Sequence, residues 1–279
     1  MSILTYNFES EYLKNNHSVT VILPDKPRAL TPKQFYGNGR KYKVLWLLHG
    51  TYGDHTDWVR KTNIEMYATE KNLVVVMPQA LNSNYSNWGS EFMLGYRMYD
   101  YLTEELMPLV YGWLPVSPLR EDNFIAGLSM GGRGAIKYAV NFPEKFAAAA
   151  ILSAAPVDFM RISPHNPNSI LDSCHPRLKA SIDNAGGLEA FRNSCENVWA
   201  AIDRLAPTGR LPRLMFACGT EDSLIYTNLL VFREHCEKIG LDVHWMIREG
   251  YRHEWCFWDL AIQEAISFFG LTEQGGNPY

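Results

Sequence analysis

The stretch NFIAGLSMGG, which runs from Asn123 to Gly132, decides the fold of this chain. Its apolar first part predicts a buried strand, and the residues that follow it, RGAIKYA, predict a helix. Between them lies a G-x-S-x-G motif centred on Ser129, the pattern of a sharp strand-to-helix turn that exposes a serine hydroxyl. Such a turn strains its central residue and leaves little room beside it, a demand that Gly127 and Gly131 meet. The motif therefore predicts a nucleophilic serine at the end of a strand.

Short apolar runs alternate with helical patterns elsewhere in the chain, which is typical of βα units around a mostly parallel sheet. Several runs lack polar alternation, as expected of strands that are covered on both faces. The expected strands are 19–23, 44–48, 73–77, 123–126, 147–152, 214–217 and 243–247. The expected helices are 96–111, 132–141, 226–239 and 260–269. We therefore expect an α/β fold, with helices flanking a mostly parallel central sheet, formed as a single domain by residues 1–279.

The segment 156–212 breaks this alternation. It is rich in Pro, Asn, Ser and Gly, and its helical pieces around 188–192 and 198–205 are short. A loop of this length inside a compact domain usually has a function or a small structure of its own. We expect an inserted cap or lid above the carboxyl edge of the sheet, with a peripheral excursion away from the chemistry as the alternative.

The composition disfavours several classes of protein. The net charge of −4 provides no basic surface for nucleic acid or for an anionic membrane. The five cysteines form no C-x-x-C pair, so neither a disulfide framework nor a zinc site is expected. The sequence shows no signal-peptide pattern and no apolar stretch long enough to span a membrane. We therefore expect a soluble cytoplasmic protein.

The predicted serine requires a histidine, because a hydroxyl is a poor nucleophile until a base removes its proton. His253 is the first candidate, since it follows the strand 243–247 and precedes the last helix, which suits the chain order Ser, acid, His. His49 is the chief alternative, but it directly follows an early strand in the run HGTYG, a place that suits an oxyanion loop. His235 and His244 lie inside a predicted helix and a predicted strand, where structural roles are expected.

The acid of such a site should follow a strand between the serine and the histidine. Glu221 and Asp222 are neighbours after the strand 214–217. We select Asp222, because the shorter side chain is the usual acid on this kind of scaffold, where it orients the histidine and stabilises its imidazolium form. Glu221 and the earlier Asp158 are the alternatives, and an ordinary helix N-cap would also explain Asp222.

Two backbone N–H groups are needed to stabilise the oxyanion of the tetrahedral intermediate. The first expected donor is the amide of Met130, the residue after the nucleophile. The second should come from the loop at Gly50 and Thr51, where glycine allows the backbone to approach closely. An oxyanion hole is therefore predicted between this loop and the start of the helix after Ser129.

With Ser129, Asp222 and His253 assigned, the chain resembles the esterase D-like branch of the α/β-hydrolases, in particular tributyrin esterases and the related feruloyl and acetyl-xylan esterases. The resemblance covers roughly residues 4–269. The chain departs from the family pattern at Arg133, where the family commonly has an aromatic residue. Its insertion is also longer than that of small tributyrin esterases. The resemblance is carried, in the family's order, by LLHGTYG (47–53), DW (57–58), VVMP (75–78), AGLSMGG (126–132), CGTED (218–222) and HEW (253–255).

This resemblance implies a serine carboxylesterase with the α/β-hydrolase fold. Its substrates would be esters of short-chain acyl or hydroxycinnamoyl acids, often on carbohydrates, cleaved through an acyl-enzyme without metal or cofactor. Some relatives are dimers or larger, so a homo-oligomer is one expectation. A thioesterase of the S-formylglutathione hydrolase type and an acyltransferase are the enzymatic alternatives. A binding module on an inactive hydrolase fold is disfavoured by the intact Ser129, Asp222 and His253.

Three aromatic residues are candidates for the substrate cleft. Trp88 follows another strand at the same sheet edge, where it would stack on an aromatic acyl group or a sugar ring. Trp255 and Tyr226 flank the predicted histidine and acid. Ordinary packing is the alternative explanation for all three.

Overall fold

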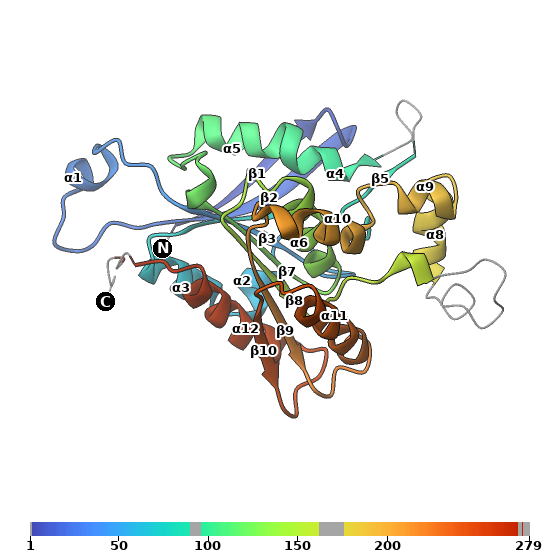
Figure 1. Cartoon of the computed structure of the whole chain (residues 1–279). Helices are drawn as coiled ribbons and strands as arrows, with labels where there is room; N and C mark the ends of the chain where they lie inside the picture. Colours follow the sequence, from blue (N-terminus) through green and yellow to red (C-terminus); the bar gives the residue numbers. More distant parts are fainter. Residues whose placement is uncertain (1, 90–95, 162–175, 273–274, 276–279) are drawn as a thin grey trace.

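A computed structural model of the chain describes residues 2–89, 96–161, 176–272 and 275 (Figure 1). An eight-stranded sheet runs through it in the order β1-β2-β4-β3-β7-β8-β9-β10. The strand β2 pairs antiparallel with β1 and β4, and all other neighbours pair parallel. The strands are β1 Ser2–Ser10, β2 Asn15–Leu23, β3 Val44–Leu48, β4 Val74–Pro78, β7 Asn123–Leu128, β8 Ala148–Leu152, β9 Arg213–Gly219 and β10 His244–Arg248. The predicted α/β architecture is confirmed.

The central strands are buried along their whole length. Every residue of β3, β4, β7 and β8 is shielded from solvent. Their sequences are nearly continuous apolar runs because helices cover both faces of a parallel sheet. A separate two-stranded sheet pairs β5, Asn87–Trp88, with β6, Tyr96–Arg97.

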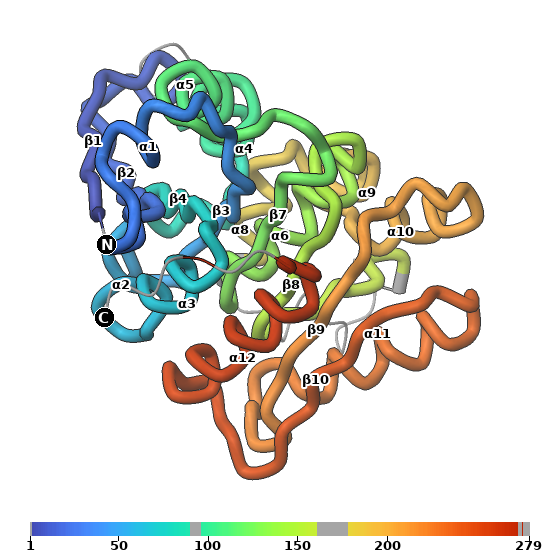
Figure 2. Tube along the Cα trace, turned by 90° about the vertical axis from the view of Figure 1, so that its left-hand side faces the viewer, coloured from blue at the N-terminus to red at the C-terminus, as the bar shows by residue number. Residues whose placement is uncertain are grey.

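Helices form one layer on each face of the sheet. On one face, β3 and β7 pack with η1, α5, α6, α10 and α11 into a single apolar core. On the other, the same sheet packs against α2, α3 and α12, and α12 contacts α3 (Figure 2). The helices are α1 Pro32–Tyr36, α2 Asp57–Lys61, α3 Ile64–Glu70, α4 Met98–Asp100, η1 Tyr101–Leu106, α5 Met107–Trp113, η2 Arg120–Asp122, α6 Met130–Asn141, η3 Phe159–Arg161, α8 Pro176–Asn184, α9 Leu188–Arg192, α10 Val198–Leu205, η4 Ala206–Thr208, α11 Tyr226–Lys238 and α12 Trp255–Phe268.

The structure differs from the sequence prediction mainly at short or amphipathic elements. The strand β1 was not predicted, although its half-buried residues Leu4, Tyr6 and Phe8 alternate with exposed ones, as in an edge strand covered on one face. The helix expected over 96–111 starts at Met98, because residues 96–97 pair in β6, and its middle turn is π-helical. The last helix starts at Trp255 instead of residue 260.

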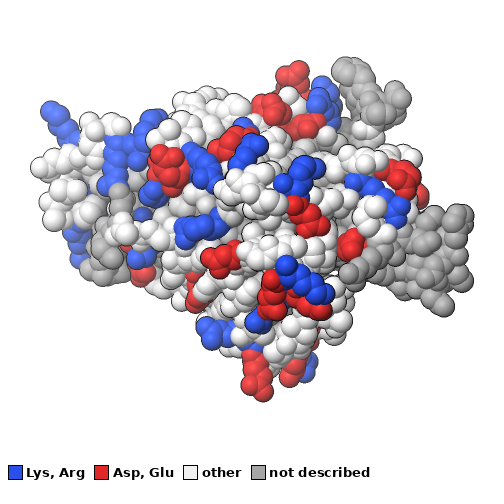
Figure 3. Space-filling view, in the orientation of Figure 1, with Lys and Arg blue, Asp and Glu red and all other residues white. Residues whose placement is uncertain are grey.

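Surface charges of both signs are interspersed on the face drawn in Figure 3. Several form local ion pairs, among them Arg97 with Asp100 and Arg233 with Glu237. Within the described ranges, no helix is long and apolar enough to cross a membrane.

Candidate active site

The G-x-S-x-G motif forms the strained turn that the sequence predicts. Ser129 lies between β7 and α6 with φ 52° and ψ −114°, a conformation that non-glycine residues rarely adopt. Its amide N–H donates to the carbonyl of Leu152 at 2.8 Å, which ties the turn to the end of β8. A Cβ on Gly127 would lie 2.5 Å from the backbone of Gly131. The motif glycines are therefore required by close backbone contact on both sides of the serine.

Asp222 and His253 are brought together from two different connections. Asp222 follows β9, His253 follows β10, and the His253 Nδ1 lies 2.8 Å from the Asp222 Oδ2. The carboxyl group is fully buried, whereas the histidine side chain is 21% exposed. Such a carboxylate holds Nδ1–H in place and leaves Nε2 as the proton acceptor.

The environment of Asp222 keeps its carboxyl group ionised. Burial alone would raise its pKa, but hydrogen bonds from His253, Ser153 and the Leu224 amide, together with the charge of the histidine, outweigh burial and lower the pKa below its usual value. The carboxylate is thus available to orient a histidine at neutral pH.

The two alternative acids are engaged elsewhere. The Glu221 carboxylate pairs with the Arg252 guanidinium at 3.2 Å, and both side chains are largely exposed. The Asp158 Oδ1 accepts the amide N–H of Met160 within a turn. Of the three candidates, the one that contacts the predicted histidine is Asp222.

His49 is held in a structural position between two loops. It is almost fully buried, and burial lowers its pKa. The Ala80 amide donates to its Nε2 at 2.8 Å, so its Nδ1 carries the proton and donates to the carbonyl of Gly50 at 2.7 Å. Both ring nitrogens are therefore used by the backbone, and neither is available as a general base.

The loop that follows β3 lies directly on the strained turn. A Cβ on Gly131 would meet the Leu48 carbonyl oxygen at 2.3 Å, and a Cβ on Gly50 would meet the Leu128 side chain at 2.4 Å. The start of α6, with Met130 as its first residue, therefore contacts the same short stretch that carries Thr51. This contact is the arrangement that two converging N–H groups would require.

The topology places all of these residues at one edge of the sheet. The strands β7, β8, β9 and β10 are adjacent and parallel, so Ser129, Asp222 and His253 follow carboxyl ends that lie side by side. Ser129 and His253 are both partly exposed. No hydrogen bond joins the Ser129 hydroxyl to the His253 ring within the described part of the chain, so the structure brings the acid and the histidine into contact but leaves the serine separate. Such bonds are often long or absent in unliganded sites.

The three aromatic candidates occupy different positions around this edge. The Trp88 indole N–H donates to the carbonyl of Ser83 at 2.5 Å, and the residue is half-buried. Tyr226 begins α11, and its amide donates to the carbonyl of Asp222 at 2.9 Å. Trp255 packs edge-on against Trp58, with ring centroids 5.4 Å apart. Each of the three has a structural contact, and their roles toward a substrate stay predictions.

A buried lysine that the sequence argument missed lies on the helix behind the serine. Lys137 of α6 is only 3% exposed, and its Nζ pairs with the Glu196 carboxylate at 2.7 Å. The same ammonium donates to the carbonyls of Asn84 and Tyr85. It thereby joins α6, the loop after β4 and the segment before α10. A lysine inside the otherwise uncharged run GAIKYA, residues 134–139, was the available signal.

The predicted insertion contacts that same loop in its described part. Residues 162–175 lie outside the described ranges, and the remainder contains η3, α8, α9, α10 and η4. Asn184 at the end of α8 donates to the carbonyl of Asn87 at 2.7 Å and accepts from the Gly89 amide at 3.1 Å. The Asn84 side chain donates to the Ser181 hydroxyl at 3.2 Å. The helix α8 thus packs beside the connection that follows the carboxyl end of β4, and α9 contacts α8.

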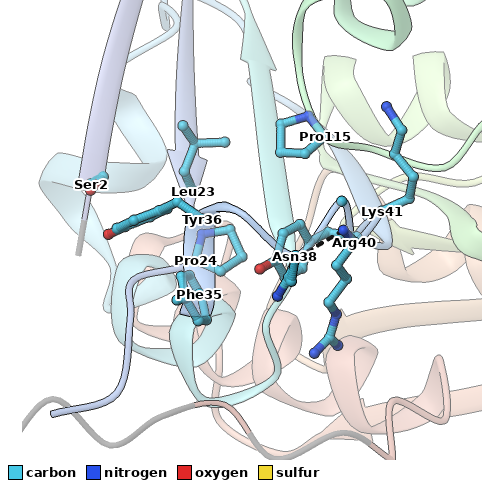
Figure 4. Close-up of a pocket in the computed structure, with 11 residues that line it drawn as sticks. Ser2, Leu23, Pro24, Phe35, Tyr36, Asn38, Arg40, Lys41 and Pro115 are labelled. Carbon is cyan, nitrogen blue, oxygen red and sulfur yellow. Dashed lines mark hydrogen bonds between the residues drawn. The ribbon is translucent and has the colours of Figure 1, made fainter. Parts of the chain in front are cut away.

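A cavity of about 350 Å³ lies at the opposite edge of the sheet (Figure 4). Its lining includes Leu23, Phe35, Tyr36 and Pro115, which surround the amino ends of the parallel strands. It is therefore remote from Ser129. No group of three or more His, Cys, Asp or Glu side chains in the described ranges could hold a metal ion.

Comparison with known proteins identifies the family of this chain. Residues 10–231 match the model of the Esterase family, described as "Putative esterase". The acetyl esterase of Caldicellulosiruptor saccharolyticus is 29% identical over 273 residues, which cover 96% of this chain and 98% of that protein.

Solved structures agree over almost the whole chain. The fluorophosphonate-binding serine hydrolase FphF of Staphylococcus aureus matches with a TM-score of 0.78 and 30% identity, covering 98% of this chain and 99% of that one. The S-formylglutathione hydrolase FrmB of the same organism matches with a TM-score of 0.75 and 30% identity, covering 96% and 98%.

Proposed function

The chain belongs to the Esterase family and is a serine carboxylic ester hydrolase, and on that premise we propose that it cleaves esters of short-chain acyl or hydroxycinnamoyl acids through an acyl-enzyme. The observation that carries the proposal is the 2.8 Å contact between Asp222 and His253, at the sheet edge where the strained Ser129 follows β7. These three residues are the proposed nucleophile, acid and base.

In the proposed mechanism, the Ser129 Oγ attacks the carbonyl carbon of the ester while His253 accepts the hydroxyl proton. Asp222 keeps the Nδ1–H of the imidazole in place and stabilises the imidazolium that forms. The amides of Met130 and Thr51 donate to the oxyanion. His253 then protonates the departing alkoxide, which leaves as the alcohol, and the acyl group remains bound to the Ser129 Oγ as an ester. Water, deprotonated by the same histidine, releases the carboxylic acid and restores the serine.

We propose that the segment 156–212 acts as the cap of this site. Its helix α8 is hydrogen-bonded through Asn184 and Ser181 to the loop 80–89, which follows β4 on the same sheet edge as Ser129. Trp88 lies within that loop and is the proposed aromatic surface for an acyl group or a sugar ring. Acyl selection would then depend on how the loop and the cap face each other.

A thioesterase of the S-formylglutathione hydrolase type is the second candidate. It is supported by the 30% identity to a staphylococcal protein of that activity over nearly the whole chain. The same serine chemistry would apply, with a thiolate as the leaving group.

A panel of substrates separates the two candidates. We would measure kcat/KM for p-nitrophenyl acetate, butyrate and octanoate, for methyl ferulate, for an acetylated xylo-oligosaccharide and for S-formylglutathione. We expect the highest value on an acetyl, butyryl or feruloyl ester. A dominant rate on S-formylglutathione would favour the second candidate. Uniformly slow hydrolysis that is unchanged in Ser129→Ala would contradict both.

A further inference from the structure

Trp258 contacts His253 directly and the side chain of Ser153, a neighbour of Asp222, although the mechanism assigns it no part. It lies in the first turns of α12 and is 6% exposed. Its ring meets the His253 imidazole edge-on, with centroids 5.0 Å apart and planes at 87°. Such an arrangement restricts the rotation of the imidazole about its side-chain bonds.

The indole N–H of Trp258 reaches the acid through a buried serine. It donates to the Ser153 Oγ at 3.0 Å, and Ser153 is completely shielded from solvent. A hydroxyl has one proton to donate, and an indole N–H can only donate. Since the Ser153 oxygen accepts from the indole, its own proton can be donated to the neighbouring Asp222 carboxylate, whose pKa the Ser153 side chain lowers. The three side chains thus form one directed chain of hydrogen bonds that ends on the acid.

Ser153 is held in place for this contact by the backbone. It directly follows β8 and has φ 46°, a left-handed conformation that is costly for a serine. Its amide donates to the carbonyl of Ala217 in β9 at 2.8 Å. The surrounding structure therefore maintains a strained backbone at this buried position, which fixes the place from which the Ser153 side chain extends.

Trp258 is itself fixed by two further tryptophans. Trp255 meets it edge-on at 5.1 Å, and Trp58 meets Trp255 in the same way at 5.4 Å. The Trp58 indole N–H donates to the carbonyl of Leu48, next to the predicted oxyanion loop. The aromatic ladder therefore connects the histidine with the loop on the other side of the serine.

We propose that Trp258 is a positioning residue: its ring edge holds the His253 imidazole while its indole N–H orients the Ser153 hydroxyl toward Asp222. This role rests on the proposed function, because it acts through the histidine that would serve as base. Its loss would leave substrate contacts intact and slow the proton transfers, so kcat should change and KM should not.

The test compares two tryptophan-to-phenylalanine variants in the full-length protein. Trp258→Phe keeps an aromatic ring and removes the N–H. Trp46→Phe is the matched control, because Trp46 is also buried and its N–H likewise donates to one side chain, Asn123, at 3.1 Å. With p-nitrophenyl acetate, we expect Trp258→Phe to lower kcat about tenfold and to leave KM within about twofold. The control should lose thermal stability and keep its kcat.

A second variant isolates the hydrogen-bonded route. Ser153→Ala removes the hydroxyl, and alanine can adopt the same backbone conformation as the serine. We expect kcat to fall several-fold. The double variant with Trp258→Phe should lose much less than the product of the two separate losses, because both changes interrupt one chain. Losses that multiply would contradict the route through Ser153, as would a Ser153→Ala variant with wild-type kcat.

The failure of each idea is recognisable. If the wild-type protein is active and Trp258→Phe keeps its kcat, as we expect of Trp46→Phe, the role of Trp258 is overturned. The proposed function is not affected by that result. A wild-type protein that is inactive on every substrate of the panel would instead overturn the proposed function.

Discussion

The turn around Ser129 and the described part of the proposed cap segment 156–212 are held in place by different kinds of contact. At the turn, backbone meets backbone so closely that even a methyl group on Gly127 or Gly131 would overlap its neighbours. The cap segment has a small apolar core of its own around Phe159 and Phe191, and reaches the loop 80–89 through single polar contacts. The proposed chemistry therefore depends on steric constraint, whereas the proposed acyl selection depends on contacts that a single substitution can change.

The largest effect should come from the turn itself. Ser129→Ala removes the proposed nucleophile, and we expect kcat/KM to fall by about 10⁴-fold or more with the thermal midpoint unchanged, because the small residue meets the same backbone strain. Ester hydrolysis and loss of labelling by a fluorophosphonate would be measured together. A variant that keeps most of its activity would remove Ser129 from the mechanism.

The next effect is expected where the two regions meet. Lys137→Met removes the ammonium that pairs with Glu196 and leaves a poorly solvated carboxylate and two carbonyls without their donor. Breaking a buried pair in this way costs about 3–5 kcal/mol, which urea unfolding would detect. The control is Lys238→Met, whose exposed ion pair with Glu234 should contribute little. Equal losses in the two variants would show that burial of Lys137 has no energetic consequence.

A smaller loss of stability should follow from filling the space at the turn. Gly131→Ala places a methyl group 2.3 Å from the Leu48 carbonyl, and we expect a cost of about 1–3 kcal/mol together with reduced kcat, since the oxyanion loop must shift. Gly112→Ala in α5 is the control, because a Cβ there meets nothing within 4 Å, and it should be neutral or stabilising. A neutral Gly131→Ala would contradict the steric account of the turn.

The buried acid should make stability depend on pH. The pKa of Asp222 is lower in the folded protein than the value of about 3.9 expected in the unfolded chain, so the folded state binds fewer protons near that pH. Its contribution is therefore present above the unfolded pKa and is lost as the pH falls through the folded pKa. We expect the difference in unfolding free energy between wild type and Asp222→Asn to be constant at neutral pH and to shrink in acid. A difference that persists unchanged at low pH would be inconsistent with an ionised Asp222.

The smallest effect is expected in the cap segment. Asn184→Ala removes two hydrogen bonds to the loop 80–89, and we expect less than about 1 kcal/mol of lost stability but a two- to fivefold change of KM, roughly, for bulky esters relative to acetate. Asn193→Ala, which loses a bond inside α9 only, is the control. Identical KM ratios in the two variants would argue against a cap that contacts the acyl group.

The sequence was most informative where a residue type has few alternatives. The glycines of the motif, the apolar strands and the order Ser129, Asp222, His253 all follow from local demands, and they predicted the sheet and the contact between acid and histidine. The edge strand β1 was missed because its half-buried residues alternate with exposed ones, and in sequence this pattern resembles an exposed loop. How the loop 80–89 and the segment 156–212 contact each other could not be predicted, since this depends on side chains far apart in the chain.

Two choices that the sequence left open were decided by tertiary structure alone. Glu221 and Asp222 are neighbours of the same charge, and only the packing of β9 beside β10 buries one against His253 and turns the other toward Arg252. His49 has the chemistry of a base, yet two backbone contacts occupy both of its ring nitrogens. The reactive groups and the edge of the sheet at which they lie could be predicted from local sequence, because strand and turn signals are local. The fold decides which of those groups form pairs, which are buried and which are already engaged in hydrogen bonds. These properties depend on neighbours that are distant in the chain.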